Sequence, residues 1–113
     1  MNITKDLVAA SATPLVLSIL AEGESYGYAI IKRVHELSGG QMQWTDGMLY
    51  PVLHRLERQG LITARWGVSE NGRRRKYYQI QAEGTKSLGT QKEQWRTVNS
   101  ILTQIWEGKP CLT

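Results

Sequence analysis

Apolar residues recur along this chain first with the period of a helix, then with that of a strand, and finally with that of a helix again. The first helical stretch covers residues 4–21. Pro14 lies inside this stretch and has no backbone N–H to donate, so an unbroken helix is not expected. We predict a kink or a restart in which Thr13 is the N-cap of the second piece.

Two more helices are predicted before the strands. Residues 26–38 carry apolar side chains at intervals of four and three residues, and a pair of glycines follows as a stop signal. Thr45 is the predicted N-cap of a third helix that ends at Gly60, because a threonine hydroxyl can accept the free amides of a first turn. Pro51 is expected to bend or loosen the start of this helix. Its predicted buried stripe consists of Leu49, Val52, Leu53 and Leu56.

After the third helix the pattern alternates with a period of two, as in half-buried strands. The two predicted strands are residues 62–66 and 76–81, and residues 67–75 form the loop between them. A two-stranded hairpin with a long tip is therefore expected. The side chains predicted to face inward from this hairpin are Ile62, Trp66, Tyr78 and Ile80.

A last helix is predicted from residue 82 to about residue 107. Its apolar side chains recur at heptad spacing and form a seam of about three heptads. Such a seam has more apolar surface than a small three-helix domain needs, so we expect it to meet a partner. The seam consists of Leu88, Trp95, Val98, Leu102 and Ile105, with Ile101 and Trp106 beside it.

The order helix, helix, short turn, helix and hairpin is typical of a winged helix-turn-helix. The predicted fold is therefore mainly α with a small β-hairpin, and 113 residues suit a single unit of this kind. The winged helix-turn-helix is predicted to span residues 1–81, the last helix residues 82–107 and a tail residues 108–113. In this fold the third helix enters the major groove of DNA, and the hairpin lies along the adjacent backbone or minor groove.

Positive charge is concentrated in about a fifth of the chain. The formal net charge is +4, yet residues 54–76 alone carry seven cations and two anions. Four consecutive cations follow the turn signal Asn71-Gly72 at the predicted hairpin tip. Neighbouring cations repel one another unless a polyanion lies between them, so this run favours DNA as the partner. For an isolated basic run, a solvated turn is the alternative. The run consists of Arg73, Arg74, Arg75 and Lys76.

The outward face of the third helix carries further candidate DNA contacts. Gly47 allows a close approach to a phosphate, and the hydroxyls of Thr45 and Tyr50 can donate hydrogen bonds to it. His54 and Arg55 are long enough to reach base edges. A half-buried packing role is the alternative for Tyr50.

Three segments of the sequence resemble the PadR family of transcriptional regulators: residues 26–30, 47–62 and 72–78. The block GMLYPVLHRLERQGLI together with the segment GRRRKYY is highly specific, and the resemblance covers residues 5–107. The single C-terminal helix is similar to that of small-subfamily members, which include multidrug-sensing repressors.

The resemblance implies a winged helix-turn-helix plus a C-terminal dimerisation helix, with the N-terminal helix also contributing to the dimer interface. It further implies a homodimeric bacterial repressor whose wing and third helix contact a palindromic operator. These roles carry over to Thr45, Tyr50, His54, Arg73, Arg74, Arg75 and Lys76, and also to Tyr26. Arg55 and Gly47 are added from the helix face.

The resemblance also implies an effector site. In drug-sensing relatives, a tryptophan of the last helix pairs with its symmetry mate and sandwiches flat aromatic ligands at the dimer centre. Trp95 is at the matching position, but Lys92 and Arg96 beside it suit neutral or anionic ligands better than cationic drugs. Packing of the dimer seam is the alternative role for Trp95. The implied effector site consists of Trp95, Asn99, Ala10 and Thr13.

Other chemistry is not indicated. No cluster of histidine, cysteine and acidic residues has metal-ligand spacing, and we predict neither a catalytic site nor a cofactor. Residues 13–20 are too short and too polar to span a bilayer, and no signal peptide is recognised. The single cysteine, Cys111, can form no internal disulfide, so we expect a cytoplasmic protein that is nucleoid-associated when bound to DNA.

The predicted function is a homodimeric, sequence-specific DNA-binding repressor, released by a small aromatic effector. The alternative is a winged-helix protein–protein interaction module, in which the basic hairpin meets an acidic protein surface.

Overall fold

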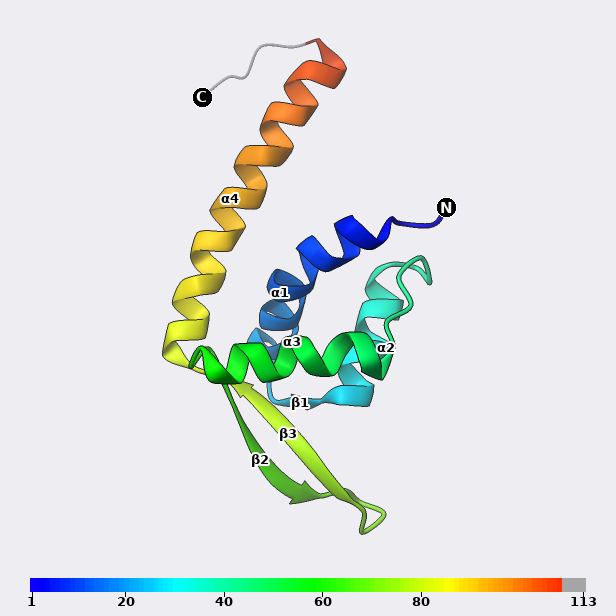
Figure 1. Cartoon of the computed structure of the whole chain (residues 1–113), viewed down its shortest axis with the longest axis vertical. Helices are drawn as coiled ribbons and strands as arrows, with labels where there is room; N and C mark the ends of the chain where they lie inside the picture. Colours follow the sequence, from blue (N-terminus) through cyan, green and yellow to red (C-terminus); the bar gives the residue numbers. More distant parts are fainter. Residues whose placement is uncertain (109–113) are drawn as a thin grey trace.

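The computed structural model describes residues 1–108 and confirms a mainly α winged helix-turn-helix (Figure 1). The first three helices form the body, α4 rises away from it, and the hairpin β2–β3 projects from the opposite end. Cys111 and the rest of the predicted tail beyond Gly108 lie outside the described residues. The elements are α1 (Lys5–Ala21), β1 (Ser25–Tyr26), α2 (Gly27–Leu37), α3 (Asp46–Arg58), β2 (Ile62–Val68), β3 (Arg74–Ile80) and α4 (Ala82–Glu107).

Helix α1 is continuous across Pro14, so the predicted restart with Thr13 as N-cap is wrong. Its N-cap is Thr4, whose hydroxyl accepts the amide of Leu7 at 3.4 Å, and Thr13 lies inside the helix. A proline removes one intrahelical hydrogen bond, but burial of an apolar face stabilises the helix on both sides of it. The buried residues of α1 are Ala12, Val16, Leu17, Ile19 and Leu20.

The sheet within residues 1–108 has three strands, not the predicted two, in the order β1-β3-β2. The short strand β1 pairs antiparallel with β3, which places Tyr26 opposite Tyr77. Sequence analysis had assigned Tyr26 to the second helix, because a strand of two residues is too short to show an alternating pattern. Tyr26 is in fact the N-cap of α2, so β1 joins the hairpin to the start of that helix.

The register of the hairpin runs from Ile62 opposite Ile80 to Val68 opposite Arg74. Directly opposed residues share a face, so the four side chains predicted to face inward do lie on one face. The helices cover only the half of that face that lies next to the body. Tyr78 is 1% exposed, whereas Trp66 is 60% exposed because the hairpin extends beyond the body (Figure 1). Trp66 therefore does not belong to the core.

Two glycines fix how α3 and α4 connect to the sheet. Gly60 has a φ of +74° and ends α3 as predicted, and the next amide, of Leu61, donates to the carbonyl of Leu56 at 3.0 Å. Gly84, in the first turn of α4, packs directly on the backbone of Leu61. A Cβ at Gly84 would lie 2.1 Å from the Leu61 carbonyl oxygen. The start of α4 is thus seated against the segment that follows α3.

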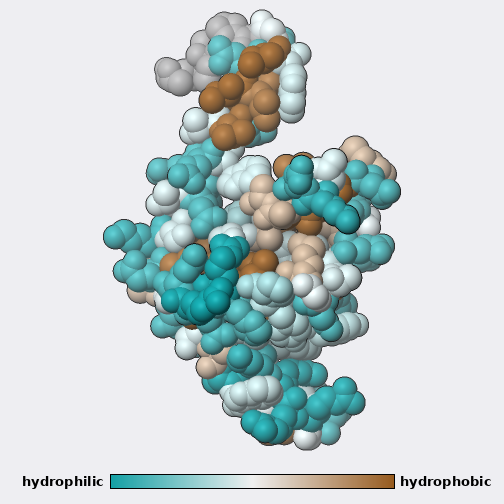
Figure 2. Space-filling view, in the orientation of Figure 1, coloured by the Kyte–Doolittle hydropathy of each residue, from teal (hydrophilic) through white to brown (hydrophobic). Residues whose placement is uncertain are grey.

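Beyond this seat, α4 exposes its apolar face. Gly84 and Leu88 are its buried residues, and the face further along is open within a single chain. Figure 2 shows a hydrophobic patch over this distal part of α4. Among the described residues, no helix combines the length and the apolarity that a membrane span requires. The exposed apolar residues of α4 are Trp95, Val98, Ile101, Leu102, Ile105 and Trp106.

The stability of the protein at alkaline pH depends on the burial of Tyr78 in the core. Its hydroxyl is buried without a hydrogen-bond partner among residues 1–108, and burial, with smaller effects of Tyr50 and Glu57, raises the pKa of Tyr78 to about 12. A tyrosine in the unfolded chain has a pKa of about 10, so the folded state holds this proton more tightly. The resulting stabilisation is complete below pH ~10 and is lost as pH rises from ~10 to ~12.

We therefore expect Tyr78→Phe to leave the free energy of unfolding within about 1 kcal/mol of the wild-type value near neutral pH. Between pH ~10 and ~12 the variant should lose less stability than the wild type. Urea unfolding of both proteins across this range measures the difference, and equal losses would contradict the role given to Tyr78.

Candidate nucleic-acid interface

The start of α3 is built as predicted. Thr45 is its N-cap, and the Thr45 hydroxyl accepts the amide of Met48 at 3.3 Å. Asp46 follows in the first turn, where an acidic side chain suits the positive end of the helix dipole. Gly47 is exposed, and a Cβ placed there would meet only the Thr45 hydroxyl, at 3.9 Å. A phosphate can therefore approach the backbone closely at this position.

Tyr50 is partly packed and partly exposed. The residue is 36% exposed, while its hydroxyl lies against Gly27 at the start of α2, where a Cβ would be 2.5 Å away. The centre of its ring lies 6.4 Å from that of His54, which is itself exposed. Tyr50 thus fastens α3 to α2 and still presents one edge beside His54. The packing role is thus present in the structure, whereas a hydrogen bond from the Tyr50 hydroxyl to a phosphate stays a prediction.

The side chain of Arg55 is directed toward α1. Its Nη2 donates to the hydroxyl of Thr13 in α1 at 2.7 Å, and this hydrogen bond is partly buried. The structure therefore does not bring Arg55 together with Tyr50 and His54. The same bond occupies Thr13, which was predicted to line an effector site.

The wing is defined as β2, β3 and the loop between them. Hydrogen bonds to the backbone and to the side chain of Ser69 close its tip. The amide of Ser69 donates to the carbonyl of Arg73 at 2.9 Å, and the amide of Arg73 donates to the Ser69 hydroxyl at 3.2 Å. Gly72 has a φ of +77°, a conformation that favours glycine. Arg73 is exposed at this tip.

The cations that follow Arg73 alternate between the two faces of the wing, because successive side chains of a strand point to opposite sides. The guanidinium of Arg74 lies 4.6 Å from the ring centre of Trp66. The guanidinium of Arg75 lies 3.9 Å from the ring centre of Tyr26. Each cation–π contact restricts a long side chain that would otherwise sample many conformations. The side chains of Arg74 and Arg75 are therefore held on opposite faces of the wing.

Two ion pairs tie the wing to the body. Nζ of Lys76 lies 3.5 Å from a carboxylate oxygen of Glu57 in α3. Nε of Arg65 donates to Glu24, which precedes β1, at 2.9 Å. This hydrogen bond raises the pKa of Arg65 above its usual value. The hairpin is thus linked to α3 on one side and to the start of β1 on the other.

Sequence analysis missed Trp66 and Arg65 as parts of this arrangement. The strand register was the missing signal, because it places Arg74 on the face of Trp66 and pairs Arg65 with Tyr77. The composition of the hairpin alone does not fix that register. The exposed surface of the projecting wing is mainly hydrophilic (Figure 2).

The predicted effector residues are only partly brought together. A hollow of about 230 Å³ lies between α1 and α4 beside Trp95. Ala10 and Thr13 do not line it, and Asn99 is exposed further along α4. The residues that line it are Ser11, Pro14, Leu15, Ser18, Leu88, Lys92 and Trp95.

Comparisons with known proteins agree with this geometry. The model of the transcriptional regulator PadR-like family matches residues 16–90. The chain is 34% identical over 80 residues to the transcriptional regulator YqjI of Escherichia coli, a match that covers 71% of this chain and 37% of that protein.

Solved structures give the same answer over nearly the whole chain. One is a transcriptional regulator from Clostridium thermocellum, with 31% identity, a TM-score of 0.82 and coverage of 90% of this chain and 96% of that chain. Another is a PadR family transcription regulator from Clostridium difficile, with 33% identity, a TM-score of 0.75 and coverage of 85% and 98%. These relatives are regulators and not enzymes, as predicted for this chain. The chain belongs to the PadR-like family of transcriptional regulators.

Proposed function

We propose that two copies of this chain bind a palindromic operator and repress transcription until a small aromatic effector releases them. The observation that carries this proposal is the joint position of α3 and the wing. Both lie away from the distal part of α4 (Figure 1). The ion pair between Lys76 and Glu57 links them directly. Backbone contacts by the wing would set the position of the protein, and α3 would read base edges. We infer a cytoplasmic protein that resides on the nucleoid when bound.

The proposed DNA contacts follow from exposure and from the hydrogen bonds already described. Arg55 is left out because Thr13 holds its guanidinium. Tyr26 is included as the support of Arg75. The interface would consist of Tyr26, Thr45, Gly47, Tyr50, His54, Arg73, Arg74, Arg75 and Lys76.

Selection of bound duplexes from random DNA tests this function. We expect a pseudo-palindrome with half-sites about ten base pairs apart, or a multiple of that spacing. If the dimer neutralises about six to ten phosphates, affinity should fall steeply and log-linearly with salt concentration. A chain that retains no duplex at low salt, but captures acidic proteins, would be an interaction module instead.

The apolar face of α4 supports the homodimer. Ile105 is 71% exposed and Trp95 is 38% exposed in the single chain, and both lie on the heptad seam. Pairing two such seams around a twofold axis would bury both copies of the same face. The two wings would then be related by the same axis, as a palindrome requires.

We expect Ile105→Glu to raise the dimer dissociation constant by at least about tenfold, because the seam would bury an unpaired carboxylate. Gln104→Glu is the matched control, since it adds the same charge on the helix face away from the seam. Sedimentation equilibrium measures both dissociation constants. An unchanged constant for Ile105→Glu would place the dimer contact elsewhere.

The effector proposal depends on Trp95. Its indole borders the hollow beside α1, and the twofold axis would bring a second Trp95 close enough to stack a flat ligand between them. Release would follow if the ligand binds more tightly to a dimer whose α3 helices are wrongly spaced for the operator.

We expect a planar aromatic ligand to quench the tryptophan fluorescence of the wild type more strongly than that of Trp95→Phe. Stacking on an indole quenches its emission, and the remaining three tryptophans report any binding at other places. Titration of both proteins with the same ligand gives the comparison. Identical quenching curves would exclude Trp95 from the site.

A further inference from the structure

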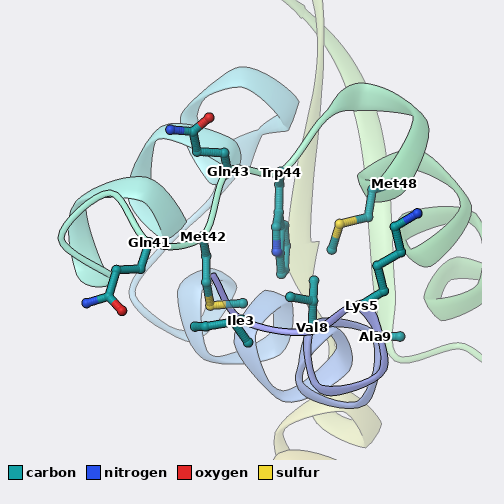
Figure 3. Close-up of a pocket in the computed structure, with 9 residues that line it drawn as sticks. All are labelled: Ile3, Lys5, Val8, Ala9, Gln41, Met42, Gln43, Trp44 and Met48. Atoms are coloured by element: carbon teal, nitrogen blue, oxygen red, sulfur yellow. The ribbon is translucent and has the colours of Figure 1, made fainter. Parts of the chain in front are cut away.

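A second hollow, of about 420 Å³, lies between the start of α1, the segment that joins α2 to α3, and the first turn of α3 (Figure 3). Its volume falls within the range of small-molecule sites, about 300–1,000 Å³. It shares no lining residue with the hollow beside Trp95. Most of its lining is apolar and consists of Ile3, Val8, Ala9, Met42, Trp44 and Met48.

Trp44 brings an unpartnered polar group to this hollow. The residue is 5% exposed, and its Nε1–H has no hydrogen-bond partner among residues 1–108. Figure 3 shows the indole standing between Met42 and Met48, with Val8 beneath it. A buried donor without an acceptor costs about 1–3 kcal/mol, so such groups are usually paired. The Nε1 atom is closed to solvent, so an acceptor atom on a ligand would complete this hydrogen bond after the flexible Met42 or Met48 side chain turns aside.

The charge of the lining favours an anion. Lys5 is its cation, and none of its residues is acidic. The other polar lining groups are the side-chain amides of Gln41 and Gln43, which can donate hydrogen bonds. Lys5 is exposed on a flexible stem, so its ammonium can turn toward a ligand at the rim. A carboxylate would meet donors here without repulsion from a lining acid.

We propose that this hollow binds a small aliphatic carboxylate. The hydrocarbon part would pack on Met42 and Met48, whose thioether side chains adapt to irregular shapes. The carboxylate would accept the Nε1–H of Trp44 and pair with Lys5. Trp44 is the one aromatic ring in the lining, which suits an aliphatic chain better than a stacked ring system.

The hollow also borders the proposed recognition helix. Met48 lies in the first turn of α3, and its amide donates to the hydroxyl of the N-cap residue Thr45. Trp44 directly precedes Thr45 in the chain. A ligand in contact with Trp44 and Met48 would therefore act on the end of α3 that approaches DNA. This consequence rests on the proposed function, whereas the site itself does not.

Nitrogen-15 NMR of the full chain with octanoate as the probe tests the site. The four tryptophans give separate indole N–H signals, and Trp44→Phe assigns the signal of Trp44. We expect this signal to shift saturably with octanoate and to shift less with the neutral analogue 1-octanol. Lys5→Met should raise the dissociation constant for octanoate about threefold, as for a partly exposed ion pair. Lys86→Met is the matched control, because Lys86 lies on α4 and does not line the hollow, and it should leave that constant unchanged.

Three outcomes would overturn parts of the proposal. A Trp44 signal that does not move, or a shift confined to Trp95, would exclude the site. Equal octanoate affinity in the wild type and in Lys5→Met would exclude the ion pair. Duplex affinity that is unchanged at saturating octanoate would exclude the link to α3. Failure to bind any duplex, with the Trp44 response intact, would count against the proposed function alone.

Discussion

Replacement of Gly84 by alanine is expected to destabilise the folded chain by about 3 kcal/mol, which is a large core effect for a single methyl group. The added Cβ would lie 2.1 Å from the carbonyl oxygen of Leu61 and 2.8 Å from a side-chain carbon of Ile80. Backbone on one side and a packed strand on the other leave no flexible atom that can move away cheaply. The start of α4 would have to shift, and the hydrogen bond from the Gln81 amide to the same carbonyl would be strained.

Thermal unfolding at a fixed protein concentration measures this effect, and the expected fall in Tm is roughly 10 °C. Gly89→Ala is the matched control, because it makes the same change in the same helix where a Cβ meets nothing within 4 Å. That variant should gain up to about 1 kcal/mol from helix propensity. Similar Tm values for the two variants would mean that α4 does not seat on Leu61.

Removal of two wing charges, in Arg74→Gln with Arg75→Gln, is expected to weaken duplex binding by about a hundredfold at moderate salt. A dimer would lose four cations, each of which releases counterions on binding a phosphate. The slope of log affinity against log salt should fall by up to about 4 units. Because phosphate contacts carry no base information, operator and random duplexes should be affected alike.

The matched control is Lys86→Gln with Arg96→Gln, which removes the same charge from α4. This control should bind duplex nearly as the wild type does, since these cations lie on α4 and outside the proposed DNA interface. Fluorescence anisotropy over a salt series gives affinities and slopes for all three proteins. A wing variant that keeps the wild-type slope would show that these arginines do not meet phosphates.

The fold could be predicted from the sequence where a pattern extends over several turns. The N-cap of α3 at Thr45, its stop at Gly60 and the full length of α4 are as predicted. Two local features could not be predicted. Pro14 suggested a break, but burial of the following turn outweighs one lost hydrogen bond. Strand β1 has two residues and is defined by its partner β3, not by its own composition.

The candidate interface, like the fold, could be predicted from the sequence only in part. The charge and the location of the basic run could be predicted, because a cluster of cations is visible in the sequence alone. The partner of each cation could not. Arg55 was assigned to DNA from its helix face, yet a hydroxyl on a distant helix holds it. The stacking of Arg75 on Tyr26 required the register of β3 beside β1.

The close packing of Gly84 on Leu61 has a mechanical consequence for any signal that starts at the proposed dimer seam. Helix α4 has 26 residues and would measure about 39 Å along its axis, so it can act as a stiff lever. Because the first turn of α4 packs against the segment after α3, the helix and the body would move together as one unit. A tilt of about 5° about the far end of α4 would displace the proposed DNA-reading surface, next to the base of the helix, by about 3 Å. The range of half-site spacings that a dimer accepts would then depend on the rigidity of the contact between Gly84 and Leu61.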